Sequence, residues 1–194
     1  MYRLPSISLF PSLSKEEKVE VLAHLFERCE TLTELIFSTV LYDSNTTFAS
    51  YTQLIEAVRT ALRKYLTEAE ETAEKTHTAI DSKIAKIIAA HPRLGGSSKA
   101  SAEKLSQHSS SEQKSLQTSS AEEASLLVVL NDEYESVFPG LRYVVFVNGR
   151  SRPVVMENMS SRIARNDIQK EREEAFEAMC DIANDRASKL VEKI

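Results

Sequence analysis

The amino-acid sequence predicts an all-α fold, a single-domain bundle of about seven or eight helices. Its 194 residues suit one domain, or at most two small ones. Only 4 Gly and 5 Pro interrupt the chain, too few for the many turns of an all-β fold. Hydrophobic residues make up 42% of the chain, which is enough for a core, and they recur at helical spacing. We therefore expect residues 1–194 to form one helical domain.

The composition argues against several classes of partner. A formal net charge of −5 does not fit a nucleic-acid-binding surface, and no apolar run is long enough to span a membrane. Residues 1–5 begin no secretory signal, and Ser188-Lys189-Leu190 is not at the C-terminus, where a peroxisomal signal must lie. Cys29 and Cys180 fit the core of a reduced, intracellular protein. We therefore expect a cytoplasmic or peroxisomal protein that binds neither nucleic acid nor membrane.

The first half of the chain is expected to form helices after a loop at residues 6–11. Ser14, followed by two glutamates, is typical of a helix N-cap. Apolar residues then recur at helical spacing in residues 19–26 and 29–37. Residues 51–66 form a further amphipathic segment with a continuous apolar face.

Two polar stretches follow. Residues 67–78 are acidic, and we expect a solvated helix face or a loop there. Residues 99–120 are rich in Ser, Gln, Glu and Lys and contain few apolar residues. That composition is typical of a flexible linker, an interpretation that competes with any functional site in this stretch.

The second half is expected to contain three helices and one extended segment. Residues 120–137 are strongly periodic, and Phe138-Pro139-Gly140 ends that helix. Residues 143–147 are apolar and strand-like, but they are too isolated to build a sheet, so we expect a buried extended segment among helices. From Pro153 a helical pattern runs to the end of the chain, with an interruption near residues 166–167.

The most informative motif is His91-Pro92-Arg93-Leu94-Gly95-Gly96, which follows a helical pattern at residues 81–90. Because proline disfavours the α conformation of the residue before it, His91 must leave the helix there, and the glycines let the chain turn away. An imidazole held at a helix end can donate or accept a proton near neutral pH. A lone histidine is nevertheless more often a structural or surface residue, so this motif alone does not define a catalytic site.

A second polar motif, Ser109-Ser110-Ser111-Glu112-Gln113, lies at a predicted helix start. A capping box with Ser109 as N-cap and Glu112 at the third helical position explains both residues without any chemistry. The same helix start would also suit an anionic ligand, because its free N–H groups and its dipole favour negative charge. The two interpretations are compatible.

Arg162 and Arg165 lie in the helical pattern that follows the extended segment. An arginine in this position has three possible roles: it faces solvent, it pairs with a neighbour such as Glu157, or it is buried and binds a substrate carboxylate. The residues alone do not decide between these roles. The histidines and cysteines lack metal-ligand spacing, so no metal is expected, and there is no phosphate-binding glycine loop or nucleophile elbow.

Together these segments resemble the OHCU decarboxylase family, whose members convert 2-oxo-4-hydroxy-4-carboxy-5-ureidoimidazoline (OHCU) into (S)-allantoin. Each motif is weak alone, but their order and spacing make the set fairly specific, and the resemblance runs across nearly the whole chain. The matching segments are Leu25-Phe26-Glu27, His91-Pro92-Arg93-Leu94-Gly95, Ser109-x-x-Glu112-Gln113, Leu130-Asn131-x-x-Tyr134, and Arg162 followed by Asn166 and Glu171.

The resemblance implies an all-helical, cofactor-free and often dimeric enzyme, so we expect a small-molecule substrate and a homodimer. It gives His91 the role of proton donor, Glu112 that of its partner carboxylate and Arg162 that of the substrate-binding arginine. A carboxylate beside the imidazole would favour the charged, proton-donating form of His91. Further substrate contacts implied by the resemblance are Pro92, Ser109, Gln113 and the backbone of Tyr143, Val144, Val145, Phe146 and Val147.

The chain departs from the family pattern at residues 138–145, where Pro139 and Gly140 stand in the opposite order and one residue is inserted. The spacing from Arg162 to Asn166 is also one residue longer, so Arg165 is an alternative to Arg162. These differences leave open an enzyme that decarboxylates a related ureido or imidazoline acid. A non-enzymatic helical interaction module is the alternative from another class. It is favoured if His91, Glu112 and Arg162 do not converge on one pocket.

Overall fold

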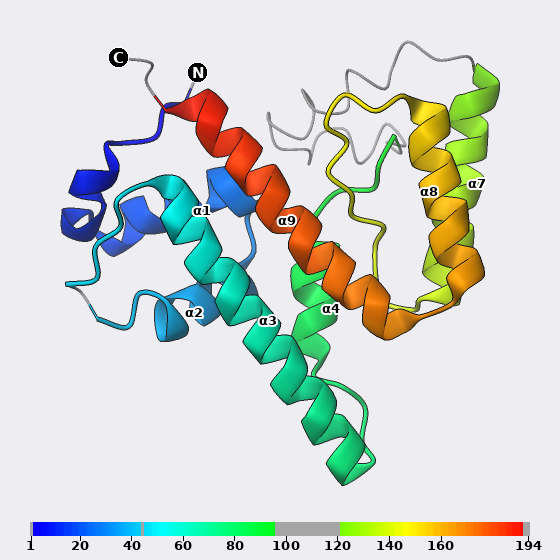
Figure 1. Ribbon diagram of the computed structural model, residues 1–194, viewed down its shortest axis with the longest axis horizontal. Helices are drawn as coiled ribbons and strands as arrows, with labels where there is room; N and C mark the ends of the chain where they lie inside the picture. Colours follow the sequence, from blue (N-terminus) through cyan, green and yellow to red (C-terminus); the bar gives the residue numbers. More distant parts are fainter. Residues whose placement is uncertain (1, 44, 96–120, 192–194) are drawn as a thin grey trace.

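The computed structural model describes residues 2–43, 45–95 and 121–191. Over these residues the chain forms seven α-helices and one 3₁₀ helix without any β-strand, so the predicted all-α fold is confirmed (Figure 1). The expected site residues Ser109, Glu112 and Gln113 lie outside the described residues. The elements are η1 (Ile7–Ser12), α1 (Lys15–Phe26), α2 (Glu30–Thr39), α3 (Tyr51–Thr76), α4 (Ser82–Ala89), α7 (Ala121–Val137), α8 (Arg152–Arg165) and α9 (Ile168–Leu190).

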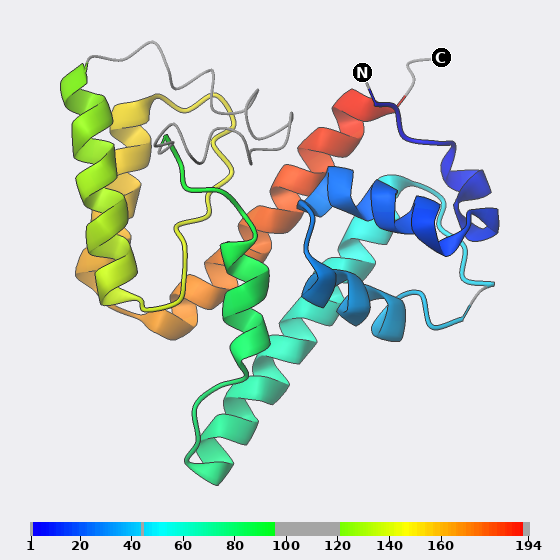
Figure 2. The same cartoon turned by 180° about the vertical axis from the view of Figure 1, so that it is seen from behind.

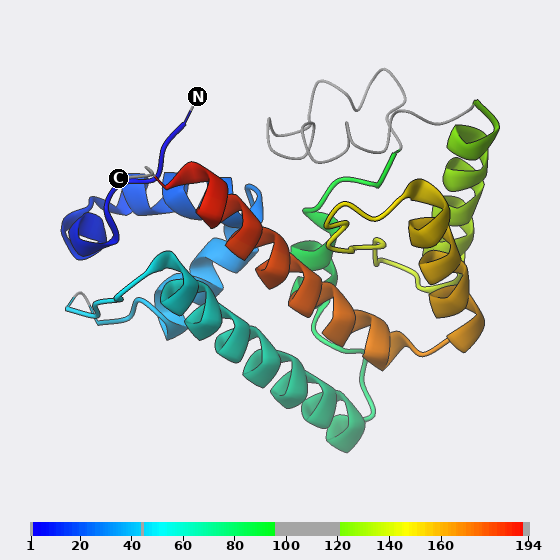
Figure 3. The same cartoon turned by 45° about the horizontal axis from the view of Figure 1, so that its top comes forward.

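The two longest helices, α3 and α9, lie side by side and run in opposite directions (Figures 1 and 3). Arg59 on α3 forms ion pairs with residues near the middle of α9, whereas Glu70 near the end of α3 meets Arg172 near the start of α9. Each helix buries an apolar stripe at intervals of four residues, namely Leu54, Val58 and Leu62 on α3 and Ala175, Met179 and Ala183 on α9.

The other helices form two groups around this pair. Helix α1 packs against α9, and α4 packs against both α2 and α9. Helices α7 and α8 pack against each other beside the start of α9 (Figures 1 and 2). The chain that joins α7 to α8 lies between α9 and the α7–α8 pair (Figure 3). The fold therefore places this connecting segment between the two groups of helices.

The helix boundaries follow the capping signals in the sequence. Ser14 Oγ accepts a hydrogen bond from the Glu17 N–H at 3.2 Å, and Glu17 Oε2 accepts one from the Ser14 N–H at 2.7 Å, which completes a capping box. Asn166 ends α8 in the left-handed conformation with φ 50°, and Asp167 caps the N-terminus of α9. The predicted helix start at Ser14 and the interruption at residues 166–167 are confirmed.

Two segments are more helical than the sequence suggests. The prediction of a loop at residues 6–11 is wrong, because the 3₁₀ helix η1 forms there around Phe10, whose side chain is buried. Helix α3 continues through the acidic stretch to Thr76, so the helix-face alternative is the correct one for most of residues 67–78. The Thr76 hydroxyl donates to the Thr72 carbonyl, and Lys75 pairs with Glu71, which stabilises these exposed turns.

The segment after α7 is extended and partly buried, as predicted. Helix α7 ends at Val137, and the chain turns at Gly140, whose φ of 84° suits glycine. Residues 141–147 then run without regular secondary structure. Tyr143 and Val144 are buried, with 2% and 3% of their surface exposed. This segment is therefore a partly buried backbone strip that is not part of a sheet.

Candidate active site

His91 lies at the point where the chain leaves α4. The helix ends at Ala89, and the His91 N–H still donates to the Ile88 carbonyl at 3.2 Å. The next residue is Pro92, which prevents a further helical turn. The His91 side chain is buried, with 4% of the residue exposed. The prediction that His91 stands at a helix end is confirmed, and its ring points into the protein.

Two charged residues from distant parts of the chain influence this imidazole. Glu27 follows α1, and Arg186 lies in the last turns of α9. Arg186 Nη2 is 2.7 Å from Glu27 Oε1, and only 2% of Arg186 and 8% of Glu27 are exposed. Both residues act electrostatically on His91. His91, Glu27 and Arg186 therefore form a buried cluster of ionisable groups, which we call the His91 cluster.

His91 is neutral at neutral pH in this environment. Burial lowers the pKa of the imidazole, the positive charge of Arg186 lowers it further, and Glu27 only partly opposes them, so that the pKa falls from 6.5 to about 4. Within the described part of the chain, neither ring nitrogen has a hydrogen-bond partner. The resting state thus differs from the charged, proton-donating imidazole that the sequence suggests, because the described surroundings disfavour a second positive charge.

Glu27 is held in an unusual backbone conformation. Its φ of 68° and ψ of 160° lie in a region that is essentially restricted to glycine. Such a conformation costs about 1–3 kcal/mol and persists only where the surrounding structure enforces it. The carboxylate that pairs with Arg186 is therefore placed by a strained residue, which is typical of functional sites.

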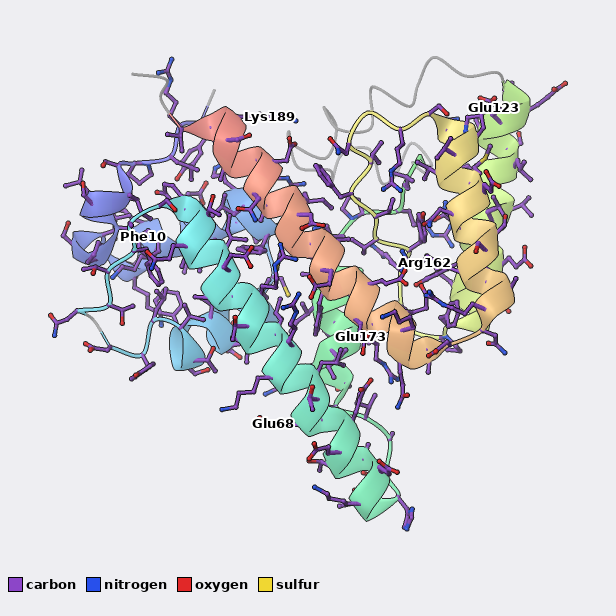
Figure 4. All side chains as sticks on the ribbon, in the orientation of Figure 1. Phe10, Glu68, Glu123, Arg162, Glu173 and Lys189 are labelled. Carbon is purple, nitrogen blue, oxygen red and sulfur yellow. The ribbon has the colours of Figure 1, made fainter. Side chains whose placement is uncertain are left out.

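Arg162 does not join the His91 cluster. It lies on α8 (Figure 4). Its side chain is buried, and its Nε and Nη2 lie 2.8 and 2.6 Å from Oε2 of Glu171 on α9. Its Nη1 donates to the Val144 carbonyl at 3.1 Å, and its guanidinium stacks over the Tyr143 ring at 4.8 Å. The arginine that acts on His91 is Arg186 instead. Arg162 is therefore bound to protein groups on three sides.

Glu171 is the centre of this second polar network. The carboxylate is fully buried, and besides Arg162 it accepts a 2.6 Å hydrogen bond from the Tyr134 hydroxyl. Arg165, the predicted alternative to Arg162, donates to the other carboxylate oxygen at 2.5 Å and also pairs with Glu174. Both candidate arginines are thus engaged by the carboxylates at the start of α9, and the neighbour Glu157 is not their partner.

The extended segment at residues 143–147 offers free backbone donors. Its carbonyl groups at Val144 and Phe146 accept hydrogen bonds from Arg162 and Arg150. Within the described residues, none of its N–H groups donates a hydrogen bond. Since buried backbone N–H groups are almost always paired, this strip can accept a ligand that carries carbonyl or carboxylate oxygens.

One pocket of about 360 Å³ lies beside this segment and α9. Arg162 is among its lining residues together with Asn158 and Arg150, whereas His91 is not. The structure therefore brings Arg162 together with Val144, Val145 and Phe146, and separately brings His91 together with Glu27 and Arg186. The pocket lining includes Val144, Val145, Phe146, Asn148, Arg150, Asn158, Arg162, Glu174, Glu177, Ala178 and Asp181.

Arg186 is not among the site residues that the sequence predicts, although its position carries a signal. It stands seven residues after Met179 and three after Ala183, on the apolar stripe of α9. An arginine on a buried stripe needs a buried partner. Glu27 belongs to one of the segments that resemble the family, but nothing in the sequence pairs it with a residue near the other end of the chain.

Two further observations concern ligands and membranes. Among residues 2–43, 45–95 and 121–191, no three His, Cys, Asp or Glu side chains gather closely enough to hold a metal ion. No helix in these ranges is long and apolar enough to cross a membrane. Cys29 and Cys180 are both free; Cys180 is buried in α9, and Cys29 caps the N-terminus of α2.

The fold and the His91 cluster define a small all-helical protein with a buried imidazole next to an arginine–carboxylate pair. The fold is similar to the crystal structure of (S)-allantoin synthase, with a TM-score of 0.63, 15% sequence identity and 96% of this chain covered. The chain spans 54% of that structure's length, so the likeness concerns about half of it. The comparison with curated protein sequences gives no match.

The family comparison is more specific. Residues 11–188 match the family described as OHCU decarboxylase, and the chain therefore belongs to the OHCU decarboxylase family. The members of this family are carboxy-lyases, which agrees with the enzyme class that the sequence motifs imply.

Proposed function

We propose that this protein decarboxylates OHCU to (S)-allantoin, a step of urate degradation, with residues of the His91 cluster at the reacting centre. The family match over residues 11–188 supports the reaction. The observation that carries the choice of site is the buried imidazole of His91, whose two ring nitrogens have no partner within the described residues, beside the Glu27–Arg186 pair. A buried polar ring without a partner is costly unless a ligand completes it.

The chemistry requires one bond to break and one to form. The bond between the ring carbon and the carboxylate breaks, carbon dioxide leaves, and the electron pair stays on the ring carbon. The adjacent C=N or C=O group of the substrate delocalises that charge, so the substrate supplies its own electron sink and we propose that no cofactor or metal takes part. The hydroxyl-bearing carbon becomes a carbonyl, and a proton must reach one face of the neighbouring, ureido-bearing carbon to give the S product.

His91 is the proposed proton donor. The resting imidazole is neutral because its pKa lies at about 4. A substrate carboxylate that enters the cluster adds a negative charge, which raises the pKa of the imidazole and lets it take up a proton on binding. After carbon dioxide leaves, the imidazolium can deliver this proton to the adjacent carbon. Glu112 remains the proposed partner carboxylate, as the family resemblance implies.

Arg186 is the arginine that we propose for the substrate carboxylate. It is buried next to His91, whereas Arg162 and Arg165 are held by Glu171. Besides its bond to Glu27, Arg186 donates from Nη1 to the Leu25 carbonyl at 3.4 Å. Its planar guanidinium has the fork geometry that suits a carboxylate ligand. Glu27 would then hold the guanidinium in place. Arg162, the arginine that the family resemblance implies, lines the pocket with Val144, Val145 and Phe146 and stays the alternative substrate-binding arginine.

The remaining contacts follow the family resemblance. We propose that Pro92, Ser109 and Gln113 line the site and that the N–H groups of residues 143–147 bind the ureido or ring oxygens. The absence of hydrogen bonds from these N–H groups to described residues supports the second proposal. The altered sequence at residues 138–145 is the reason to keep a related ureido or imidazoline acid as the second candidate substrate.

The decisive experiment adds the purified protein to OHCU freshly made from urate by uricase and the hydrolase that follows it. Circular dichroism should show (S)-allantoin appearing faster than in the spontaneous decay, which gives both enantiomers. His91→Gln should abolish the acceleration, whereas His77→Asn, a change at an exposed helix end that tolerates the left-handed conformation, should leave it intact. No acceleration by the wild-type protein would refute the proposed function.

We further propose that the protein acts as a homodimer in the cytoplasm or the peroxisome. The family resemblance supports the dimer, and the two compartments are those that the sequence leaves open. Light scattering at micromolar concentration should give a mass of twice the chain's 21.8 kDa. Imaging of the tagged protein would distinguish the two compartments.

A further inference from the structure

The position of the His91 ring depends on its backbone. An imidazole is commonly oriented by a hydrogen bond to one of its two nitrogens. In the described part of the chain His91 has no such bond, so the ring is held by packing and by the course of residues 91–95. On the α4 side, the bond from the His91 N–H to the Ile88 carbonyl fixes the start of this loop.

Arg93 ties the same loop to α7. Its Nε lies 2.7 Å from Glu135 Oε1 and its Nη2 lies 2.8 Å from Glu135 Oε2, so the two groups form a bidentate pair. Nη2 also donates to Asp132 Oδ1 at 2.7 Å. Asp132 and Glu135 are three residues apart on α7 and therefore share one face of the helix. Bidentate arginine–carboxylate pairs add geometric specificity as well as energy.

Other contacts of the loop come from the same direction. Asn131 of α7, which is buried, donates from Nδ2 to the Leu94 carbonyl at 3.1 Å. Arg142, just after α7, donates to the His91 carbonyl at 3.0 Å. At Gly95 a Cβ atom would lie 2.3 Å from Leu127 Cδ2, so the loop meets α7 too closely for a side chain. The loop that carries His91 is thus fixed from the α7 side at several points.

We propose that Arg93 is a positioning residue for His91 and acts through its bidentate pair with Glu135. The proposal rests on the proposed function, because it concerns the proton-transfer geometry of the same site. Arg93 is two residues from His91 and pairs with carboxylates outside the His91 cluster. A displacement of about 1 Å at a reacting group can reduce the rate by about 100-fold. Loss of the pair should therefore reduce kcat while KM stays nearly constant.

The test is a double-mutant cycle with Arg93→Ala, Glu135→Ala and the double variant. Arg93→Ala should reduce kcat by about 10- to 100-fold with less than a threefold change in KM. The double variant should be no slower than Arg93→Ala, because both changes remove the same interaction. Arg93→Lys keeps the charge but not the fork, and its kcat should lie between wild type and Arg93→Ala.

The control is Arg63→Ala. Arg63 forms an ion pair with Glu177 between α3 and α9 that is more exposed than that of Arg93: 62% of the Arg63 side chain is exposed, against 31% for Arg93. The Arg63→Ala variant should lose at most about 1 kcal/mol of unfolding free energy and keep its kcat. If Arg93→Ala keeps its kcat within threefold, or if its kcat falls only as far as its folded fraction, the positioning role is wrong. If Arg93→Ala does not fold, the same criteria apply to Arg93→Lys.

A second readout separates this proposal from the proposed function. The imidazole carbon resonances of His91, assigned by comparison with His91→Gln, report the ring's environment without substrate. They should shift in Arg93→Ala and shift no further in the double variant, while those of His24 and His77 stay in place. Unchanged His91 resonances would refute the proposal even if the wild-type protein had no decarboxylase activity.

Discussion

Glu27 and Arg186 form a buried ion pair, 2.7 Å apart, although 159 positions separate them in the sequence. The pair joins the end of α1 to the last turns of α9 and lies next to His91. The pair therefore links the first and last α-helices of the described chain at the proposed reacting centre. The role of each of its two residues can be tested separately.

Arg186→Gln is expected to reduce kcat/KM by about 10- to 100-fold, since one charge-assisted hydrogen bond to a ligand contributes about 1.5–3 kcal/mol. The change also leaves Glu27 without its partner, so the folded fraction must be measured by circular dichroism in parallel. Steady-state kinetics on fresh substrate checks the result. A variant that is fully folded and fully active would show that Arg186 does not contact the substrate.

The strained backbone of Glu27 can be tested by comparing the stabilities of two side-chain replacements. Glu27→Ala and Glu27→Gly both remove the carboxylate, but only glycine adopts the observed φ of 68° and ψ of 160° without cost. We expect Glu27→Gly to be more stable than Glu27→Ala by about 1–3 kcal/mol in urea unfolding, although glycine usually destabilises relative to alanine. Both variants should lose activity. Equal stability, or a more stable alanine variant, would show that the conformation carries no strain.

His91 should make the protein acid-sensitive. Its pKa is about 4 in the folded protein and 6.5 when exposed, so the unfolded chain binds more protons between these values. The unfolding free energy therefore has its full value above pH 6.5 as far as His91 is concerned. It falls as the pH decreases towards 4, by about 2 kcal/mol between pH 7 and pH 4.5. The difference in unfolding free energy between wild type and His91→Gln isolates this contribution from that of the carboxylates. A difference that does not change with pH would contradict the buried neutral state.

Arg162 is expected to stabilise the fold through its pair with Glu171. Its replacement by Met leaves Glu171 buried with its remaining partners and should destabilise the protein by about 3–5 kcal/mol. Thermal unfolding followed at 222 nm measures this loss. Arg162→Met with Glu171→Leu removes both charges and should recover part of the stability, because an apolar pair can replace a buried ion pair. If Arg162→Met alone were as stable as wild type but had a raised KM, Arg162 would be a substrate-binding residue.

Much of the fold could be predicted from the sequence because its signals are local. The capping box at Ser14 and the left-handed stop at Asn166 depend on residues within a few positions, and both are confirmed. The prediction of a loop at residues 6–11 is wrong because a short 3₁₀ helix around one buried phenylalanine has no periodic sequence pattern.

The site could be predicted only in part because its partners are distant in the chain. The placement of His91 follows from the adjacent Pro92, whereas its neutral state follows from burial and from Arg186, which no local pattern reveals. Likewise Arg162 is paired with Glu171, nine positions away on the next helix, and not with a neighbour on its own helix. Charged groups in the core are positioned by packing, which a single sequence does not display.

The Glu27–Arg186 pair also affects how the protein folds during synthesis. A ribosome releases Glu27 early, but the pair cannot close until the last turns of α9 have emerged and docked. Contacts between positions so far apart form late, because a long loop must close first. Under the proposed mechanism, the reacting centre is therefore incomplete until Arg186 has been translated and α9 has docked.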